Sequence, residues 1–413
     1  MNKHLPHELA QMQSLPLEEK VRMTKKRIRI WYESWKRYTI YDSKTNKTRY
    51  VTWTESPCKN GCYTKRTKTI NGEKVEVEVL VKGTKLKDTE YILSEIDGQV
   101  YVSFSGGKDS TVLKHIVDSM YDDVPALFVN TGLEYPEIQK FAKSQKNVTV
   151  IRPEMRFDEV IKKYGYPVIT KEVSQRIKET RAAHLRKDND AVCVKKMEGR
   201  HLSPDGKKSP YNYDKWQFMI DAPFLISHQC CDIMKKRPAH IYEKQTGRRP
   251  FIGTLANESK LRKTKWLKYG CNAFEQVNPS SQPLSFWTEQ DILHYLKKYN
   301  VPYCSVYGDI VIDEKVDGEI VLEGQTNLID YLECYEEEDK LKTTGCSRTG
   351  CMFCMFGCHL DKGKNRFQRL RETHPKQYAY CIGGGEMVDG KWQPNKEGLG
   401  LGKVLDYIGV KYE

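Results

Sequence analysis

The stretch that decides the fold is VYVSFSGGKDSTVLKHIV, residues 100–117. It begins with the short apolar run Val100–Phe104, which predicts a buried β-strand. A glycine-containing hexapeptide, Ser105–Ser110, follows at once, and the apolar residues of 111–117 open a helix. A strand, a glycine loop and a helix in this order predict a ligand site at the carboxyl end of a strand in an α/β sheet.

The residues of this loop are suited to binding phosphate. Gly106 and Gly107 allow backbone N–H groups to approach an anion closely, and the N-terminus of the following helix adds a partial positive charge. Lys108 contributes a cation. The ordinary P-loop pattern is absent because Asp109, and not Ser or Thr, follows the lysine. We therefore expect an adenine-nucleotide loop without kinase-type transfer of a γ-phosphate; the alternative is a glycine-rich turn that binds nothing.

Strand and helix patterns alternate downstream of the loop. Apolar runs predict strands at 126–129, 148–151 and 251–253, and helices are expected to open at Pro136 and near Thr288, a candidate cap. This alternation predicts an α/β fold with a doubly wound, mostly parallel sheet and right-handed connections.

Five regions are expected along the chain. Residues 39–90 alternate and contain Asn71-Gly72, which predicts β-hairpins, and Cys58 and Cys62 there leave a lone zinc knuckle as a minor alternative. Residues 176–215 are polar and basic and are expected to form a mobile or substrate-facing excursion. The regions are an N-terminal helix packing on the core (1–38, helical from 17), a β-rich insertion (39–96), the α/β domain (97–308), an acidic insertion with a hairpin and a helix (309–345), and a cysteine-rich region with a basic helix at 362–373 and a glycine-rich tail (346–413).

Composition restricts the class of protein. No apolar run reaches the roughly 20 residues of a membrane span, and no secretory signal follows the first residues, so a cytoplasmic protein is expected. The net charge of +13 favours anionic partners such as nucleotides or nucleic acid, although a lysine-rich surface that only confers solubility is an equal alternative. The 13 cysteines favour metal or redox chemistry over disulfides. Four aromatic residues interleaved with Lys and Arg agree with nucleic-acid binding, although the alternative is that most of them are core residues: Trp31, Tyr32, Trp35 and Trp266.

Several motifs resemble a known family. Ser105–Ser110 resembles the PP-loop of ATP pyrophosphatases, and residues 97–358 as a whole resemble the phosphoadenosine phosphosulfate (PAPS) reductase family, which has an adenine nucleotide alpha-hydrolase-like, Rossmann-like fold. One departure is Asn130, where the family usually has Asp. The matching segments are 128–132 with 135–137; Cys230-Cys231 with Lys235, Lys236 and Pro238; Gly253, Glu258, Ser259 and Arg262; and Pro283-Leu284, Trp287-Thr288, Asp291-Ile292 and Val301-Pro302.

The resemblance implies roles for the matching positions. Lys108, Asp109 and Arg262 would be catalytic, with Arg262 as an anion clamp. For Glu258 and Arg262 the plain alternative is a charged pair on a helix surface. The nucleotide-binding residues implied are Ser103, Ser105, Gly106, Gly107, Lys108, Asp109, Ser110, Thr131, Gly132, Gly253, Glu258 and Arg262.

The cysteines allow more than one metal site. Members of the family that carry a 4Fe–4S cluster hold it with a Cys-Cys pair and a later Cys-x-x-Cys, which Cys230, Cys231, Cys351 and Cys354 match. The spacing of Cys346, Cys351 and Cys354 also fits a plant-type 2Fe–2S site. With Cys358 the same three could instead hold Zn²⁺, or the thiols could be free or redox-active.

The expected reaction follows from two features. The resemblance implies that sulfonucleotide reductases use a mobile cysteine near the C-terminus in a motif with His, whereas the last cysteine here, Cys381, has no such partner. The intact loop suits enzymes that cleave ATP to AMP and pyrophosphate with Mg²⁺ and use the adenylate for sulfur transfer, as in DNA phosphorothioation and tRNA thiolation. The alternatives are a PAPS reductase that forms sulfite with Cys381, Cys358 or a partner's thiol, and a regulator that senses ATP and the cluster without turnover.

The expected partners follow from this chemistry. They are an adenine nucleotide, a sulfur donor such as a cysteine desulfurase or else a thioredoxin-like reductant, and nucleic acid as acceptor. A homo-oligomer without membrane association is also expected.

Overall fold

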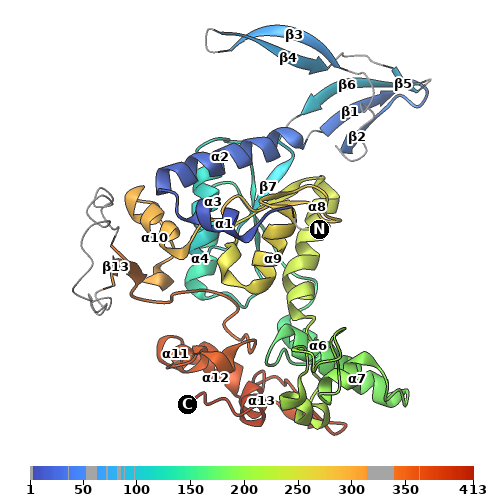
Figure 1. Ribbon diagram of the computed structural model, residues 1–413, viewed down its shortest axis with the longest axis vertical. Coiled ribbons are helices and arrows are strands. Elements are labelled where there is room, and N and C mark those ends of the chain that lie inside the picture. Colours follow the sequence, from blue (N-terminus) through green and yellow to red (C-terminus); the bar gives the residue numbers. More distant parts are fainter. Residues whose placement is uncertain are drawn as a thin grey trace. The chain divides into compact units, whose positions relative to one another are not determined.

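The computed structural model describes residues 3–35, 37–52, 63–70, 73–80, 85–87, 89–96, 98–313, 339–361 and 363–413 (Figure 1). The chain divides into two compact units, which are described separately below. The first comprises Met1–Phe128, Lys140–Thr149 and Tyr242–Arg348, and the second comprises Val129–Gln139, Val150–Ile241 and Thr349–Glu413.

A six-stranded sheet confirms the predicted α/β fold. Its order is β11-β12-β10-β7-β8-β9; β7 pairs in parallel with β10 and β8, β10 pairs in parallel with β12, and β11 pairs antiparallel with β12. β7 lies in the centre of this sheet and is covered on both faces, which explains why Val100, Tyr101 and Val102 form a continuous apolar run. The strands are β7 (Val100–Ser103), β8 (Ala126–Val129), β9 (Val148–Ile151), β10 (Arg249–Ile252), β11 (Asn272–Ala273) and β12 (Ser280–Ser281).

The helices of the first unit include the predicted helix that follows the loop. They are α1 (Pro6–Gln13), α2 (Leu17–Ser34), α3 (Lys108–Asp118), α9 (Lys260–Tyr269) and α10 (Glu289–Lys298); α4 (Pro136–Ser144) and α8 (Arg237–Thr246) each reach into both units. Thr288 caps α10 as expected, because its hydroxyl accepts a hydrogen bond from the backbone of Asp291.

Helix α2 is fastened to the core of the first unit by buried polar contacts. Lys20 donates to both carboxylate oxygens of Asp291, at 2.7 and 2.8 Å. The indole of Trp287 donates to Thr24 at 3.0 Å, and Thr24 in turn donates to a backbone carbonyl at Pro283. The prediction that this helix extends to residue 38 is wrong: it ends at Ser34, because the alternating residues of 37–42 pair on both sides as a strand.

The described residues between 37 and 96 lie mainly in strands. β1 (Arg37–Asp42), β2 (Lys47–Thr52), β5 (Lys85–Lys87) and β6 (Glu90–Ile96) form an antiparallel sheet of order β2-β1-β6-β5. The predicted hairpin is confirmed, since β3 (Tyr63–Ile70) and β4 (Glu73–Leu80) pair antiparallel up to Ile70 and Glu73. Cys58 and Cys62 lie outside the described residues. In the acidic segment β13 (Ile310–Ile312) pairs with β14 (Leu341–Thr343). The helix also expected within 309–340 is not tested, because residues 314–338 lie outside the described residues.

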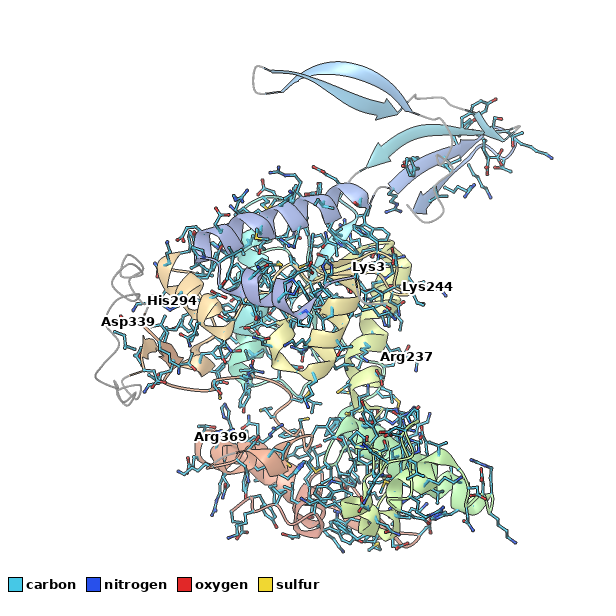
Figure 2. All side chains as sticks on the ribbon, viewed as in Figure 1. Lys3, Arg237, Lys244, His294, Asp339 and Arg369 are labelled. Atoms are coloured by element: carbon cyan, nitrogen blue, oxygen red, sulfur yellow. The ribbon has the colours of Figure 1, made fainter. Side chains whose placement is uncertain are left out.

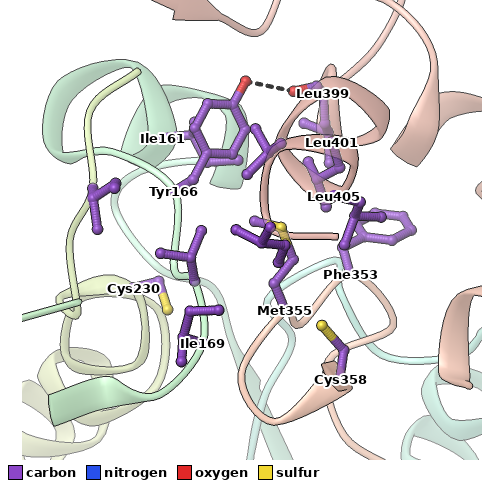
Figure 3. Close-up of a cluster of buried hydrophobic side chains, with 14 of the residues drawn as sticks. Ile161, Tyr166, Ile169, Cys230, Phe353, Met355, Cys358, Leu399, Leu401 and Leu405 are labelled. Carbon is purple, nitrogen blue, oxygen red and sulfur yellow. Dashed lines mark hydrogen bonds between the residues drawn. The ribbon is translucent and has the colours of Figure 1, made fainter. Parts of the chain in front are cut away.

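The second unit has its own hydrophobic core. Figure 3 shows part of it, where the hydroxyl of Tyr166 donates to the carbonyl of Leu399 at 2.8 Å. The C-terminal segment is not a loose glycine-rich tail, because Leu401, Val404 and Leu405 are buried in this core. The predicted basic helix begins only at Arg366, where Asn365 caps it.

The excursion expected at 176–215 instead contains regular helices. Arg181 fixes them, since its guanidinium donates to the carbonyls of Met219, Ile220, Ala222 and Phe224. The remaining elements are α5 (Phe157–Tyr164), α6 (Lys171–Leu185), α7 (Val192–Met197), the 3₁₀ helices η3 (Asp214–Asp221), η5 (Ala256–Glu258), η6 (Ser305–Tyr307) and η8 (Cys358–Leu360), the π-helix η4 (Asp232–Lys236), α11 (Arg366–Thr373), α12 (Pro375–Ile382), β15 (Glu386–Val388), β16 (Lys391–Gln393) and α13 (Leu401–Tyr407). None of the described helices has the length and hydropathy needed to cross a membrane.

Candidate functional site

The loop between β7 and α3 curls back on itself through its own hydroxyl groups. The backbone N–H of Ser105 donates to the hydroxyl of Ser110 at 3.2 Å, and that hydroxyl donates to the carbonyl of Gly107 at 2.9 Å. Gly106 has φ of 73°, a left-handed conformation that favours glycine. The first turn of α3 begins at Lys108, so its unpaired N–H groups lie directly after the loop. The arrangement is that of an anion-binding loop.

Gly253, at the end of β10, lies directly against this loop. A Cβ atom at this position would be 3.0 Å from both the carbonyl oxygen of Asp109 and the Cα atom of Ser110. These are backbone atoms that cannot move aside cheaply, so glycine is needed for the close approach of strand and loop. Ser103, the last residue of β7, is level with Ile252 in the same sheet.

Lys108 is buried and held by three groups from distant parts of the chain. Its ammonium nitrogen lies 2.9 Å from Glu289 and donates to the carbonyl of Ser347 at 2.8 Å. Its backbone N–H donates to the hydroxyl of Tyr307 at 3.1 Å. These contacts fix the ammonium group at the start of α3, beside the loop.

Two arginines stand beside Lys108. Arg262 forms an ion pair with Glu258, whose carboxylate also accepts a hydrogen bond from the backbone N–H of Leu255 at 3.0 Å. Arg348 lies 3.4 Å from Glu258 and 3.8 Å from Glu289. Lys108, Arg262 and Arg348 are therefore linked into one network by two carboxylates, as a site for a polyanion requires.

Asp109 completes the group. Burial raises the pKa of its carboxyl group above the ordinary value, and Lys108 opposes this shift. Its Oδ1 atom is buried without a hydrogen-bond partner among the described residues. A buried carboxylate oxygen without a partner is suited to a ligand, a water molecule or a cation.

Sequence analysis missed Arg348, Glu289 and Tyr307. Arg348 lies in a segment whose cysteines indicated a metal site, so the arginine itself was not considered. Glu289 is in the first turn of a helix, where acidic residues are common. Of the three, Arg348 alone has a local signal, because it lies three residues before Cys351 in the segment 347–351.

Thr131 and Gly132 belong to the second unit. Glu134, which is buried, accepts hydrogen bonds from the backbone N–H and the hydroxyl of Thr131. The side-chain oxygen of Asn130 accepts from the N–H of Gly132 at 3.1 Å, a role that the usual Asp could also perform. This turn after β8 is thus held by its own side chains.

Four cysteines of the second unit line one pocket. The pocket spans about 320 Å³, part of which is open to solvent, and the sulfur atoms of Cys230 and Cys231 are 3.9 Å apart. Its lining consists of Cys230, Cys231, Cys351 and Cys354 with Leu133, Phe157, Pro167, Met234, Lys235 and Phe353. Of the alternates, Cys358 lies in the hydrophobic core (Figure 3), and Cys346 belongs to the first unit.

The thiols of this pocket have shifted pKa values. The hydrogen bond with Cys230 lowers the pKa of Cys231, and Lys235 and Lys171 act in the same direction. Burial raises the pKa of Cys354 to about 12. Burial alone would lower the pKa of Lys235, but Cys351 and Glu134 raise it instead. A carboxylate oxygen of Glu134 lies 3.7 Å from the Lys235 ammonium nitrogen. The pocket therefore places thiol groups beside the ammonium group of Lys235.

Comparison with known proteins places the chain in a family. A short match, 36% identical over 72 residues, relates it to an uncharacterized protein of Methanocaldococcus jannaschii, and covers 16% of this chain and 18% of that relative. A crystal structure of PAPS reductase from Candida auris, a phosphate complex, is 14% identical and covers 50% of this chain and 75% of its own, with a TM-score of 0.28.

The family model described as the phosphoadenosine phosphosulfate reductase domain matches residues 99–194 and 192–356, more than half of the chain. This range contains the loop of Ser105–Ser110, the arginine pair and all four cysteines of the pocket. The chain belongs to the phosphoadenosine phosphosulfate reductase family.

Proposed function

We propose that this protein cleaves ATP to AMP and pyrophosphate and uses the adenylated intermediate for sulfur transfer, with nucleic acid as the acceptor. The burial of two thiols is the observation that carries the choice over sulfite formation. Cys381 is 0% exposed and Cys358 is 2% exposed, so neither can reach a sulfonucleotide. Burial also raises the pKa of Cys358 to about 11 and that of Cys381 well above its usual range, which disfavours the thiolate.

The cation network supports the first half of the reaction. The N–H groups of the loop would cradle the phosphates, and Lys108, Arg262 and Arg348 would neutralise their charge after exchanging Glu258 and Glu289 for phosphate oxygens. An acceptor oxygen then attacks the α-phosphorus, its bond forms as the α–β phosphoanhydride bond breaks, and pyrophosphate leaves. A sulfur nucleophile replaces the oxygen in the second half, and AMP carries that oxygen away.

Mg²⁺ fits this site. It binds proteins through one or two carboxylates while keeping contacts to substrate phosphates and water, and Asp109 provides a carboxylate oxygen that no hydrogen bond within the described residues occupies. When bound, the ion would neutralise the leaving pyrophosphate.

A 4Fe–4S cluster fits the pocket of the second unit better than a single zinc ion. Among the described residues, no three Cys, His, Asp or Glu side chains lie close enough to hold one metal ion. Zinc needs four ligands at about 2.0–2.3 Å from one centre, whereas each cysteine of a 4Fe–4S cluster binds a different iron. The four cysteines that line the pocket supply the four thiolates that such a cluster requires.

Parallel assays with labelled ATP and labelled PAPS test the proposal. Anaerobically purified protein with Mg²⁺, an oligonucleotide acceptor and a persulfide donor is expected to form AMP and pyrophosphate from ATP, and no sulfite from PAPS. Sulfite formation from PAPS with thioredoxin would show that a partner supplies the missing thiol and would favour the reductase. ATP binding without AMP under all conditions would favour a regulator.

Replacing Arg348 by alanine is expected to weaken ATP binding about tenfold, because one charge-assisted contact to phosphate is lost. Equilibrium binding of a fluorescent ATP analogue measures this. Arg22→Ala is the matched control, since Arg22 is exposed and its ion pair among the described residues is with Glu19 on its own helix. Equal affinity of Arg348→Ala and wild type would remove Arg348 from the nucleotide site.

A further inference from the structure

The segment from the end of α6 to η3, residues 184–218, presents exposed side chains on a fixed frame. Arg181 anchors one end of it to the carbonyls around Ala222. Asn212 fastens the middle, since its amide donates to the carbonyls of His201 and Ser209 and its oxygen accepts from the N–H of His201. The side chains that extend from this segment, drawn with α6 and α7 in Figure 2, therefore start from defined positions.

Aromatic rings are prominent on this segment. Tyr211 is 58% exposed and Phe218 is 45% exposed, although rings of this size are usually covered. Trp216 lies 6.1 Å from Phe218, and Tyr407 packs behind Phe218 at 5.8 Å. Tyr211 and Phe218 are thus exposed, and Phe218 is held in place by two neighbouring rings.

Two of these rings, those of Tyr211 and Trp216, are accompanied by a lysine. The ammonium group of Lys196 lies 5.6 Å from the ring centre of Tyr211, and that of Lys215 lies 5.1 Å from Trp216. The segment contains eight Lys and Arg against five Asp and Glu. Three of those acids are already paired with a basic neighbour: Asp190 with Lys195, Glu198 with Arg200, and Asp214 with Lys208.

Several cations of the segment remain available. Arg186, Lys187, Lys207 and Lys215 are exposed and form no ion pair with a carboxylate among the described residues. Exposed aromatic rings interleaved with unpaired cations suit single-stranded nucleic acid, whose bases stack on rings while its phosphates contact Lys and Arg. A protein partner would instead favour a continuous apolar patch with few charges at its centre.

We propose that the exposed side chains of residues 184–218, here named the 184–218 surface, bind single-stranded nucleic acid. The surface belongs to the same unit as the cysteine pocket. Within this unit, Trp216 lies 5.3 Å from the ring of His359. Helix α6, at whose end the surface starts, also contacts the Cys-Cys segment through Lys171 and Asp232 at 3.0 Å. The inference rests on the proposed function for the role of the strand as acceptor, but binding itself needs no turnover.

Fluorescence anisotropy with labelled 20-nucleotide single strands, of RNA and of DNA, and with the matching duplex tests the proposal. The purified full-length protein with its metal content intact is expected to bind a single strand tighter than the duplex, with affinity that falls as salt rises. Lys187→Glu/Lys207→Glu is expected to weaken binding about tenfold and to lower the salt dependence. The control Lys391→Glu/Lys396→Glu makes the same change of charge at exposed residues of the second unit outside the surface, and is expected to bind as wild type.

Substitutions of Tyr211 distinguish base stacking from the attraction between charges. Tyr211→Ala is expected to weaken binding about fivefold and Tyr211→Phe to retain it, because only the ring face is needed. Three results would overturn the proposal: an equal loss of affinity in the Lys187/Lys207 and Lys391/Lys396 variants, no preference for a single strand over the duplex, or no binding at all. The absence of any binding would favour a protein partner for this surface. AMP formation without nucleic-acid binding would refute this inference alone; binding without AMP formation would refute the proposed function alone.

Discussion

Lys108→Ala is expected to reduce AMP formation from ATP about a hundredfold or more. The side chain is the most buried cation of the network, and its position at the start of α3 directs it to the charge that develops on the leaving pyrophosphate. Removing one preorganised charge-stabilising donor from an active site costs about 10²–10³ in turnover. Labelled ATP and separation of the nucleotide products measure the loss.

The fold should tolerate this change. Glu289, the partner left behind, is 40% exposed and can be hydrated. Circular dichroism and the thermal unfolding midpoint are therefore expected to stay close to wild type. Lys263→Ala, at an exposed position next to Arg262, is the matched control and should retain turnover. AMP formation by Lys108→Ala within about threefold of wild type would remove the loop from the catalytic mechanism.

Cys351→Ser is expected to abolish iron binding. Wild-type protein purified without oxygen should be brown and contain about four irons per chain, because cysteine thiolates hold such clusters. Serine is a poor ligand for iron in this setting, so the colour, the iron and the acid-labile sulfide should be lost together. Iron analysis and the visible absorption spectrum measure this; zinc without iron in the wild type would contradict the cluster.

Three further substitutions identify the ligand set. Cys230→Ser should also bleach the protein, whereas Cys193→Ser, on α7 away from the pocket, should not. Cys346→Ser should leave the iron content unchanged, since Cys346 belongs to the other unit. Loss of iron in Cys346→Ser but not in Cys230→Ser would instead support the local plant-type site.

Features with local causes could be predicted from the sequence. The loop of residues 105–110 depends on neighbouring glycines and on the helix that follows, so its place after β7 was predictable. Thr288 was predictable as a cap because the bond to Asp291 lies within one turn. Alternating patterns gave the β3–β4 hairpin. The end of α2 was missed because pairing with β2 and β6, which depends on tertiary contacts, decides that the chain is extended from Arg37.

Features that depend on long-range packing could not be predicted. Arg348 and Glu258 are 90 residues apart in sequence, and neither position carries a pattern that anticipates their ion pair. Likewise, Tyr307 reaches the backbone of Lys108 across 199 residues. The burial of Cys381 also depends on how α12 packs in the core of the second unit, and the composition of that helix alone does not decide it.

The contacts of α2 with the core of the first unit determine which fragments of the chain can fold by themselves. The family match begins at residue 99, yet Lys20 and Thr24 satisfy Asp291 and Trp287 from outside that range. A fragment trimmed to the matching region would leave a buried carboxylate without its cation, at a cost of about 3–5 kcal/mol, and would uncover the indole ring that α2 shields. Truncation at the family boundary therefore produces an unstable, aggregation-prone polypeptide, and the natural starting point for any shortened version lies before Leu17.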